Sequence, residues 1–332
     1  MKGLYRWIFL LLCLHGSTLC AQGNPFASIY HWADHTWQHI IGNGDIDTLY
    51  LWKPATHWTL KTRANISGDS FSATGHNGVQ HFTSNLSANM KTTLSLGISY
   101  RGLSTSFSVN PNALSGTYHD YEFNISAYYN RFGFDASYHQ ANSFSGIMSG
   151  EDSIVHPVPE GIVNHDVFSF NGYYAFNHRH FSYPAAFTQS FIQQKSSGSL
   201  LAALSFQMQH VSVSSAENAN AVPFQLYSGD VSIGAGYGYN YVPFRHLLLH
   251  ISCTPTFIVY SDNYYIFGEQ QYPIAYQFPE VIITGRGAVV YSWSRWFIGL
   301  TMVYTYSTIG YNETMSLQNQ KWIIRAFVGS RF

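Results

Sequence analysis

Hydrophobic and polar side chains alternate along most of this chain from Trp58 to its last residue. Between Trp58 and Ile66, every second residue is apolar or small, apart from one threonine, and the residues between them are polar or charged. Successive side chains of a β-strand point to opposite faces, so a period of two predicts a strand with one apolar and one polar face. This pattern predicts twelve strands, at residues 58–66, 82–90, 94–109, 121–129, 132–139, 168–176, 200–208, 231–241, 247–259, 286–293, 296–306 and 321–332.

The connections between the predicted strands are alternately short and long. The short ones lie at residues 91–92, 130–131, 243–245 and 294–295, and the long ones at 68–80, 140–166, 213–228, 261–280 and 309–320. Short turns at one end and longer loops at the other are typical of outer-membrane β-barrels. Aromatic residues such as Trp293 and Trp296 also concentrate at strand ends, where a lipid interface favours them. We therefore predict an all-β fold, a transmembrane antiparallel barrel, because a soluble sandwich or propeller explains the alternation but neither regularity.

Two irregularities affect the strand count. The phase of the alternation changes at Arg101-Gly102, which predicts a β-bulge inside the strand at 94–109. A full strand at residues 180–198 would break the up-and-down order, and Pro184 does not fit an interior ladder position. Treating 180–198 as a non-spanning insertion within a barrel at 57–332 gives an even count of about twelve and places both termini in the periplasm. Ten or fourteen strands remain open, as does a plug made by this insertion.

The segment Lys321–Phe332 is an amphipathic strand that ends on an aromatic residue. One register carries Phe332, Val328 and Trp322 without any charge, and the other register carries two arginines. The ending resembles the C-terminal signal by which outer-membrane barrels are recognised and inserted. We therefore assign Trp322 and Phe332 to an assembly signal, expect outer-membrane lipids and the barrel assembly machinery as partners, and expect this strand to close the barrel against residues 58–66.

The start of the chain predicts export. Lys2 and Arg6 precede an apolar run at residues 7–14, and cleavage after Ala21 would complete a signal peptide at residues 1–21. Residues 22–56 then form a periplasmic leader, in which 24–41 has helical spacing; a short helix or plug and a mobile leader are both open. Beyond residue 21, no apolar run is long enough for a transmembrane helix. The predicted location is the outer membrane of a Gram-negative bacterium.

Composition agrees with a sheet that has one face in lipid. The 332 residues carry a net charge of −1, with 17% aromatic but only 10% charged residues. A soluble domain has about a quarter charged residues, and a nucleic-acid-binding protein has a basic stripe that this chain lacks. We therefore expect no nucleic-acid partner.

A motif in the predicted insertion resembles a known family. Residues 181–187 read Phe-Ser-Tyr-Pro-Ala-Ala-Phe, followed by Gln194-Lys195 and by Ser-Ser-Gly-Ser at 196–199. Together with Asp47-Thr48, Tyr50, residues 99–103 and Asn110-Pro111, this is similar to an uncharacterised outer-membrane barrel family found mainly in Bacteroidetes-type bacteria. The resemblance covers 45–332 and implies the fold and the location, but it implies no activity and no site residues.

Several charged residues fall on the polar face of the predicted strands. They are Lys61, Arg63, Arg101, Glu122, Asp135, Asp230, Arg286 and Arg325. We predict that they line the lumen, either as a network of ion pairs or as a basic constriction that favours anionic solutes. Glu122, Asp135 and Asp230 are the partners expected for Arg325.

No catalytic motif or cofactor motif is resolved, so neither a catalytic residue nor a metal or cofactor is assigned. His250 and Ser252 share the inward face of one strand, as a Ser/His pair would, but a catalytic pair also needs an orienting third group. The loop residues Glu151, Asp152, His156, Glu160 and His165 have no regular metal-ligand spacing. The leading hypothesis is a non-enzymatic barrel, structural or with a narrow passage for an unknown solute. The alternative is a membrane-embedded hydrolase of lipid or lipopolysaccharide.

Overall fold

The computed structural model describes residues 46–76, 81–88, 90–100, 102–111, 120–142, 144–149, 155–159, 161–213, 224–267, 270–311 and 315–332. The predicted signal peptide and the predicted helix at 24–41 lie outside these residues, as does Arg101. All the elements given below belong to one compact unit, Asp47–Phe332. No helix among the described residues is long and apolar enough to cross a membrane.

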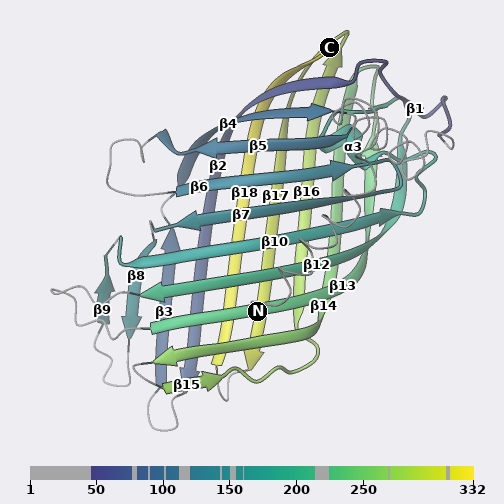
Figure 1. Cartoon of the computed structure of the whole chain (residues 1–332). Coiled ribbons are helices and arrows are strands. Elements are labelled where there is room, and N and C mark those ends of the chain that lie inside the picture. The colour runs from purple at the N-terminus through teal and green to yellow at the C-terminus, as the bar shows by residue number, and fades with distance from the viewer. Residues whose placement is uncertain are drawn as a thin grey trace, which may run out of the picture. The chain divides into compact units, whose positions relative to one another are not determined.

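Within the described residues, twelve antiparallel strands close into a barrel (Figure 1). Around the wall they are β2 (Trp58–His76), β4 (Lys91–Tyr100), β5 (Leu103–Val109), β6 (Asp120–Tyr128), β7 (Phe132–Ala141), β10 (Val163–Ala175), β12 (Ser197–Val213), β13 (Phe224–Tyr241), β14 (Leu247–Phe267), β16 (Val281–Trp293), β17 (Trp296–Tyr311) and β18 (Met315–Arg331). β18 pairs with β2 and closes the wall, as the amphipathic pattern at 321–332 predicted. We call the end with the short connections the turn end and the opposite end the loop end.

Smaller elements lie at the two ends of the barrel. β3 (His81–Ala88), β8 (Phe144–Ser149), β9 (Val155–Val158) and β15 (Gln270–Pro273) extend the sheet at the loop end. β1 (Leu51–Trp52) pairs with β11 (Ile192–Gln193) in a separate two-stranded sheet near the turn end. The helix α3 (Tyr183–Phe187) is capped by Ser182 and has Pro184 in its first turn, where the missing N–H of proline costs no hydrogen bond.

The turn and the bulge predicted between residues 90 and 103 exchange places in the structure. β3 and β4 both pair with β2, one after the other, and the register shifts by one residue between Ser70↔Ser87 and Ser67↔Lys91. The pairing of β2 therefore passes from β3 to β4 with a one-residue shift in register, as at a β-bulge, and the turn predicted at 91–92 is wrong. A hairpin turn between Tyr100 and Leu103 takes the place of the predicted bulge, because these two residues pair and Gly102 adopts a φ of +98°.

These two errors compensate in the strand count. The predicted strand at 82–90 is the loop-end continuation of β4, and the predicted strand at 94–109 is the hairpin β4–β5. The count of twelve is therefore confirmed. The second and third wall strands, however, are β4 and β5 rather than the predicted strands at 82–90 and 94–109. The other predicted strands coincide with wall strands, and most of those extend further toward the loop end.

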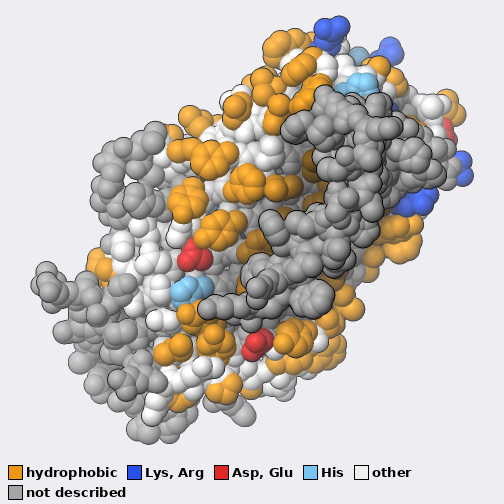
Figure 2. Space-filling view, viewed as in Figure 1, with side chains coloured by type: hydrophobic (Ala, Val, Ile, Leu, Met, Phe, Trp, Pro, Cys, Tyr) orange, Lys and Arg blue, Asp and Glu red, His pale blue; other side chains and the backbone are white. Residues whose placement is uncertain are grey.

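The outer face of the wall is apolar. Along β4, Leu94, Leu96 and Ile98 are exposed, while Ser95 between them is buried. In Figure 2, hydrophobic side chains are spread over the part of the visible face that is not grey, and lysine and arginine gather at the end where Figure 1 marks the C-terminus. Charged side chains of the wall therefore lie mainly inside or at the ends.

Residues 176–196 do not form part of the wall. β10 and β12, which precede and follow them, pair directly with each other, and Ala175 faces Leu201. Phe181, Tyr183 and Ala186 are buried. We call residues 181–193, which include α3 and β11, the lumen plug.

Candidate functional site

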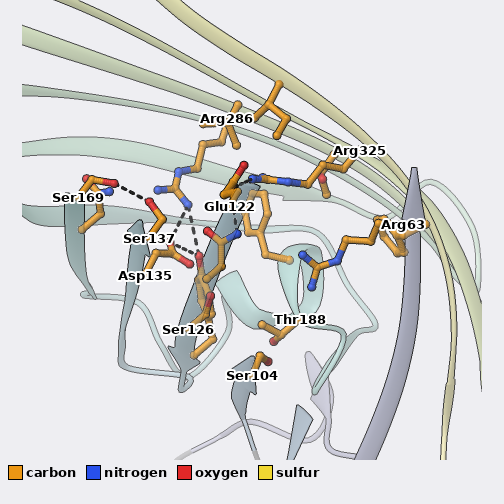
Figure 3. A pocket seen from close by; sticks show the side chains of 18 of the residues that line it. Arg63, Ser104, Glu122, Ser126, Asp135, Ser137, Ser169, Thr188, Arg286 and Arg325 are labelled. Carbon is orange, nitrogen blue, oxygen red and sulfur yellow. Dashed lines mark hydrogen bonds and ion pairs between the residues drawn. The ribbon is translucent and has the colours of Figure 1, made fainter. Parts of the chain in front are cut away.

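A polar chamber occupies the middle of the barrel lumen. Its larger cavity, of about 200 Å³, is shown in Figure 3. A second cavity of about 120 Å³ shares several wall residues with it, namely Ser169, Asn171, Arg286, Val303, Thr305 and Lys321. The two cavities therefore adjoin and form one chamber lined by strands from opposite sides of the barrel.

Positive charge exceeds negative charge around the larger cavity. Its described lining contains five basic residues (Lys61, Arg63, Arg286, Lys321 and Arg325) and two acidic ones (Glu122 and Asp135), an excess of three positive charges. The smaller cavity adds Asp69 and Asp230 on its own side. The excess is thus concentrated toward the turn end of the chamber.

Two of the arginines form ion pairs across the chamber. Arg286 Nη1 lies 3.3 Å from Asp135 Oδ2 and also donates to the Tyr128 hydroxyl at 3.3 Å. Arg325 Nη2 lies 3.7 Å from Glu122 Oε1. Of the three partners expected for Arg325, the structure selects Glu122, which lies on a strand of the opposite wall.

Arg63 and Lys321 have no such ion pair. Arg63 donates to Ser106 Oγ at 3.4 Å, and among the described residues no carboxylate lies within 4.0 Å of Arg63 or Lys321. In Figure 3, the Arg63 guanidinium points into the same cavity as Arg286 and Arg325. The unneutralised charge around the larger cavity is therefore located at these two side chains and at Lys61, which donates to Phe187 O and to Gln189 Oε1 and to none of the described carboxylates.

The structure places six of the eight residues predicted to line the lumen around the larger cavity. They are Lys61, Arg63, Glu122, Asp135, Arg286 and Arg325. Asp230 lines the smaller cavity with Arg286, and Arg101 lies outside the described residues. Sequence reasoning missed Lys321, although it shares the register of Arg325 on the closing strand.

The lumen plug forms the floor of the chamber. Hydrogen bonds reach it from three separate strands: Lys61 Nζ donates to Phe187 O (3.0 Å), Arg331 Nε to Gln189 O (2.8 Å), and Asn240 Nδ2 to Ser182 O (2.8 Å). The side chains of Tyr128, Ala175, Phe181, Tyr183 and Leu201 form a buried apolar cluster around it. Wall and plug are thus joined by both polar and apolar contacts.

An apolar cluster closes the chamber toward the loop end. It consists of buried side chains from the wall strands other than β4, β5 and β6, from the loop-end strands β3, β8 and β9, and from the loop residue Ile274, namely Phe71, Ala73, Leu86, Ala141, Phe144, Val158, Val163, Val211, Val213, Leu226, Ile258, Tyr265, Ile274, Ile282, Ile309 and Leu317. A lumen that conducts water and solutes is lined by polar groups. The described residues therefore fill the lumen at both ends of the chamber.

A second polar site lies between the wall and the lumen plug. His250 Nδ1 is 2.7 Å from Asn240 Oδ1, and His250 Nε2 is 3.0 Å from Ser252 Oγ. All three side chains are buried. Asn240, on the neighbouring strand β13, supplies the orienting group that sequence reasoning did not find for His250 and Ser252.

Metal ligands are not gathered in the described part of the chain. His165 is buried in the lumen, where it contacts the Phe144 ring, and no group of three acidic, histidine or cysteine residues suited to a metal occurs among the described residues. Of the other loop residues considered, Glu151, Asp152 and Glu160 lie outside the described residues, and the side chain of His156 is not described.

Three solved structures illustrate the fold likeness. The chain is similar to the translocator domain of the autotransporter NalP from Neisseria meningitidis (12% identity, TM-score 0.37, covering 92% of this chain and 98% of that one). It is also similar to the outer membrane protease OmpT from Escherichia coli (8% identity, TM-score 0.43, covering 84% of this chain and 97% of that one). A third similar structure is the COG4313 outer membrane channel from Pseudomonas putida F1 (12% identity, TM-score 0.36, covering 85% of this chain and 98% of that one).

Comparison of sequences gives a family but no characterised relative. No curated protein matches the chain. The sequence profile of one family matches residues 45–332, which are nearly the whole of the described barrel. The chain belongs to the family described as Domain of unknown function (DUF4421).

Proposed function

We propose that this chain is an outer-membrane β-barrel of a Gram-negative bacterium, exported by a signal peptide at residues 1–21, whose lumen binds a small anionic solute. A closed barrel satisfies every backbone group of the wall without a sheet edge, which is what a strand-built membrane protein requires. The exposed side chains agree with this location. Leu96 is 60% exposed near the middle of β4 and Leu204 is 46% exposed near the middle of β12, and such an apolar surface is stable in lipid rather than in water.

The two ends of the barrel suit the borders of a bilayer. Trp293, Trp296, Tyr239 and Tyr241 are exposed near the turn end, as expected of an aromatic girdle. Six exposed basic residues lie at the same end: Lys53, Arg131, Arg179, Lys195, Arg245 and Arg295. Among the described residues, Asp47 is the acidic residue at that end, and it contacts His180. Such a basic collar favours contact with lipid phosphates.

The excess of three positive charges around the larger cavity is the observation that carries the binding proposal. A buried charge without a counter-charge is costly, and the chamber leaves Arg63 and Lys321 without a carboxylate partner. A small anion in this cavity would supply missing negative charge and accept hydrogen bonds from the Arg63 guanidinium. Basic residues in a lumen select anions for the same reason.

Titration of the purified barrel with inorganic phosphate, followed by calorimetry, tests this proposal. We expect saturable binding that Arg63→Gln weakens about tenfold or more, because a hydrogen bond to a charged group contributes about 1.5–3 kcal/mol. Arg131→Gln, which removes an exposed arginine at the turn end, is the matched control and should leave binding unchanged. Equal affinity of Arg63→Gln and the unmodified barrel would refute the chamber as the binding site.

Location and permeability are tested separately. We expect the chain to fractionate with outer membranes and to show heat-modifiable mobility in gels. In liposome swelling, the filled ends of the lumen predict slow entry of solutes compared with an open porin. Rapid, charge-independent swelling would show instead that the lumen is an open channel.

A further inference from the structure

The hydrogen bonds around Asn240 fix the orientation of a Ser–His–Asn chain. The Asn240 side-chain N–H₂ group donates to Ser182 O at 2.8 Å and to Gln193 Oε1 at 2.9 Å. Both partners are acceptors and both belong to the lumen plug. The amide nitrogen of Asn240 must therefore face the plug, and its Oδ1 atom must face His250.

This orientation determines the tautomer of His250. Because Asn240 Oδ1 can only accept, His250 Nδ1 carries the proton and donates to it. His250 Nε2 then has a free lone pair and accepts from the Ser252 hydroxyl at 3.0 Å. A nucleophile, a base and a group that orients the base are thus arranged in the order that serine acyl-transfer sites require.

We propose that Ser252, His250 and Asn240 form an acyl-transfer site that hydrolyses a small acyl ester. Ser252 Oγ attacks the ester carbonyl while His250 Nε2 takes the hydroxyl proton, and the C–O bond to the alcohol breaks as His250 returns that proton to the leaving oxygen. Water, deprotonated by His250, then attacks the acyl-serine and releases the acid and free Ser252. Asn240 holds the imidazole and stabilises its protonated form.

Donors for a developing oxyanion lie beside the serine. The Tyr183 hydroxyl is 3.4 Å from Ser252 Oγ, and because the Ser252 proton is engaged by His250, the tyrosine is the donor of that contact. Arg286 is the direct cross-strand partner of Ser252 in the pairing of β14 with β16. Hydrogen-bond donors aimed at the oxyanion make a large contribution to such reactions.

Access to the serine is from the chamber rather than from lipid. Ser252 faces the lumen, and its exposed neighbours Cys253 and Ile251 face outward. Tyr183 lines a small side cavity of about 30 Å³ together with Thr254 and Arg286, and its hydroxyl contacts Ser252 Oγ. Rotation of the Tyr183 side chain would expose Ser252 while Ser182 and Gln193 continue to orient Asn240. A substrate must fit the chamber, which selects a small water-soluble ester over a membrane lipid.

A purely structural role would use only part of this arrangement. The bonds from Asn240 to Ser182 and Gln193, and the contact of the Tyr183 hydroxyl with Ser252, join the plug to the wall. The contact of His250 Nε2 with Ser252 adds no bond to the plug backbone. The two roles therefore differ in whether the Ser252 hydroxyl is activated.

Labelling with a small fluorophosphonate, read by intact mass and peptide mapping, tests the proposal on the folded full-length barrel. Ser252 Oγ should displace fluoride and give one adduct on Ser252. Ser252→Ala should remove the adduct, and His250→Gln should slow labelling about 100-fold or more, as expected for loss of a general base. Ser232→Ala is the matched control, because Ser232 is equally buried on the facing strand but bonds to Thr256.

Two tyrosine variants test the access route. Tyr183→Ala should accelerate labelling because it removes the covering ring, whereas Tyr183→Phe keeps the ring and should remain slow. Heat-modifiable mobility establishes that each variant is folded. The absence of a Ser252 adduct in the folded Tyr183→Ala barrel, or an adduct that forms equally fast in His250→Gln, would overturn the proposal.

Discussion

Gly102 shows how one residue determines a connection of the barrel. Its φ of +98° lies in the region that side chains with a Cβ atom rarely adopt, and an added Cβ would lie 2.8 Å from Tyr128 O. We predict that Gly102→Val lowers the free energy of unfolding by about 1–3 kcal/mol. Gly285→Ala is the control, since nothing lies within 4 Å of its added Cβ. Urea unfolding in lipid vesicles measures both, and equal stability of the two variants would contradict the role of Gly102.

The ion pair between Glu122 and Arg325 gives a second prediction at this scale. Glu122→Leu leaves the Arg325 guanidinium in the lumen without its carboxylate, so we expect a loss of about 2 kcal/mol. Adding Arg325→Leu should restore most of that loss, because both charges are then absent. A double-mutant cycle of unfolding free energies measures the coupling. Strictly additive losses would show that the two side chains do not stabilise each other.

Among the elements, the lumen plug controls access to the chamber from the turn end. We predict that replacing residues 183–187 by glycine and serine exposes the chamber to small anionic reagents. Ser137→Cys reports on this, because Ser137 lines the larger cavity, in a background where Cys253, the one cysteine beyond the signal peptide, is alanine. A negatively charged thiol reagent should modify this cysteine at least about tenfold faster in the plug variant. Equal rates with and without the plug replacement would mean that the plug does not limit access.

The elements also show what a sequence pattern can and cannot determine. The period-two alternation located the wall strands. Each wall strand has one face toward the lumen and one face toward the outside, so its side chains alternate in character whichever residues it pairs with. The alternation could not decide between a bulge and a turn at Arg101-Gly102, because a glycine with positive φ serves both. The alternation also could not predict the floor of the chamber. The contacts of Lys61 with Phe187 and of Asn240 with Ser182 join residues more than fifty positions apart, and a local pattern carries no information on such contacts.

At the scale of the whole molecule, the chamber arises from the order of side chains along the inside of the wall. Apolar residues such as Leu226 and Ile309 face inward near the loop end, and charged residues such as Arg325 and Asp135 face inward in the middle. The sequence placed these charges on the inward face but did not indicate which ones meet. Pairing across the lumen depends on strand tilt and stagger, which alternation does not specify.

Closure of the barrel depends on Phe332 in two separable ways. Phe332 N donates to Trp58 O at 2.9 Å and Trp58 N donates to Phe332 O at 3.0 Å, so its backbone completes the seam between β18 and β2. Its ring is 56% exposed and packs little against the wall. Deletion of Phe332 removes the ring and both bonds, which together contribute about 2 kcal/mol, whereas Phe332→Ala removes the ring alone.

If the assembly machinery recognises the ring, both variants should lower the heat-modifiable, membrane-inserted fraction to a similar extent. If seam closure is decisive, Phe332→Ala should insert normally while the deletion does not. Normal insertion of both variants would refute an assembly role for this residue, and the ordering of the two separates recognition from closure.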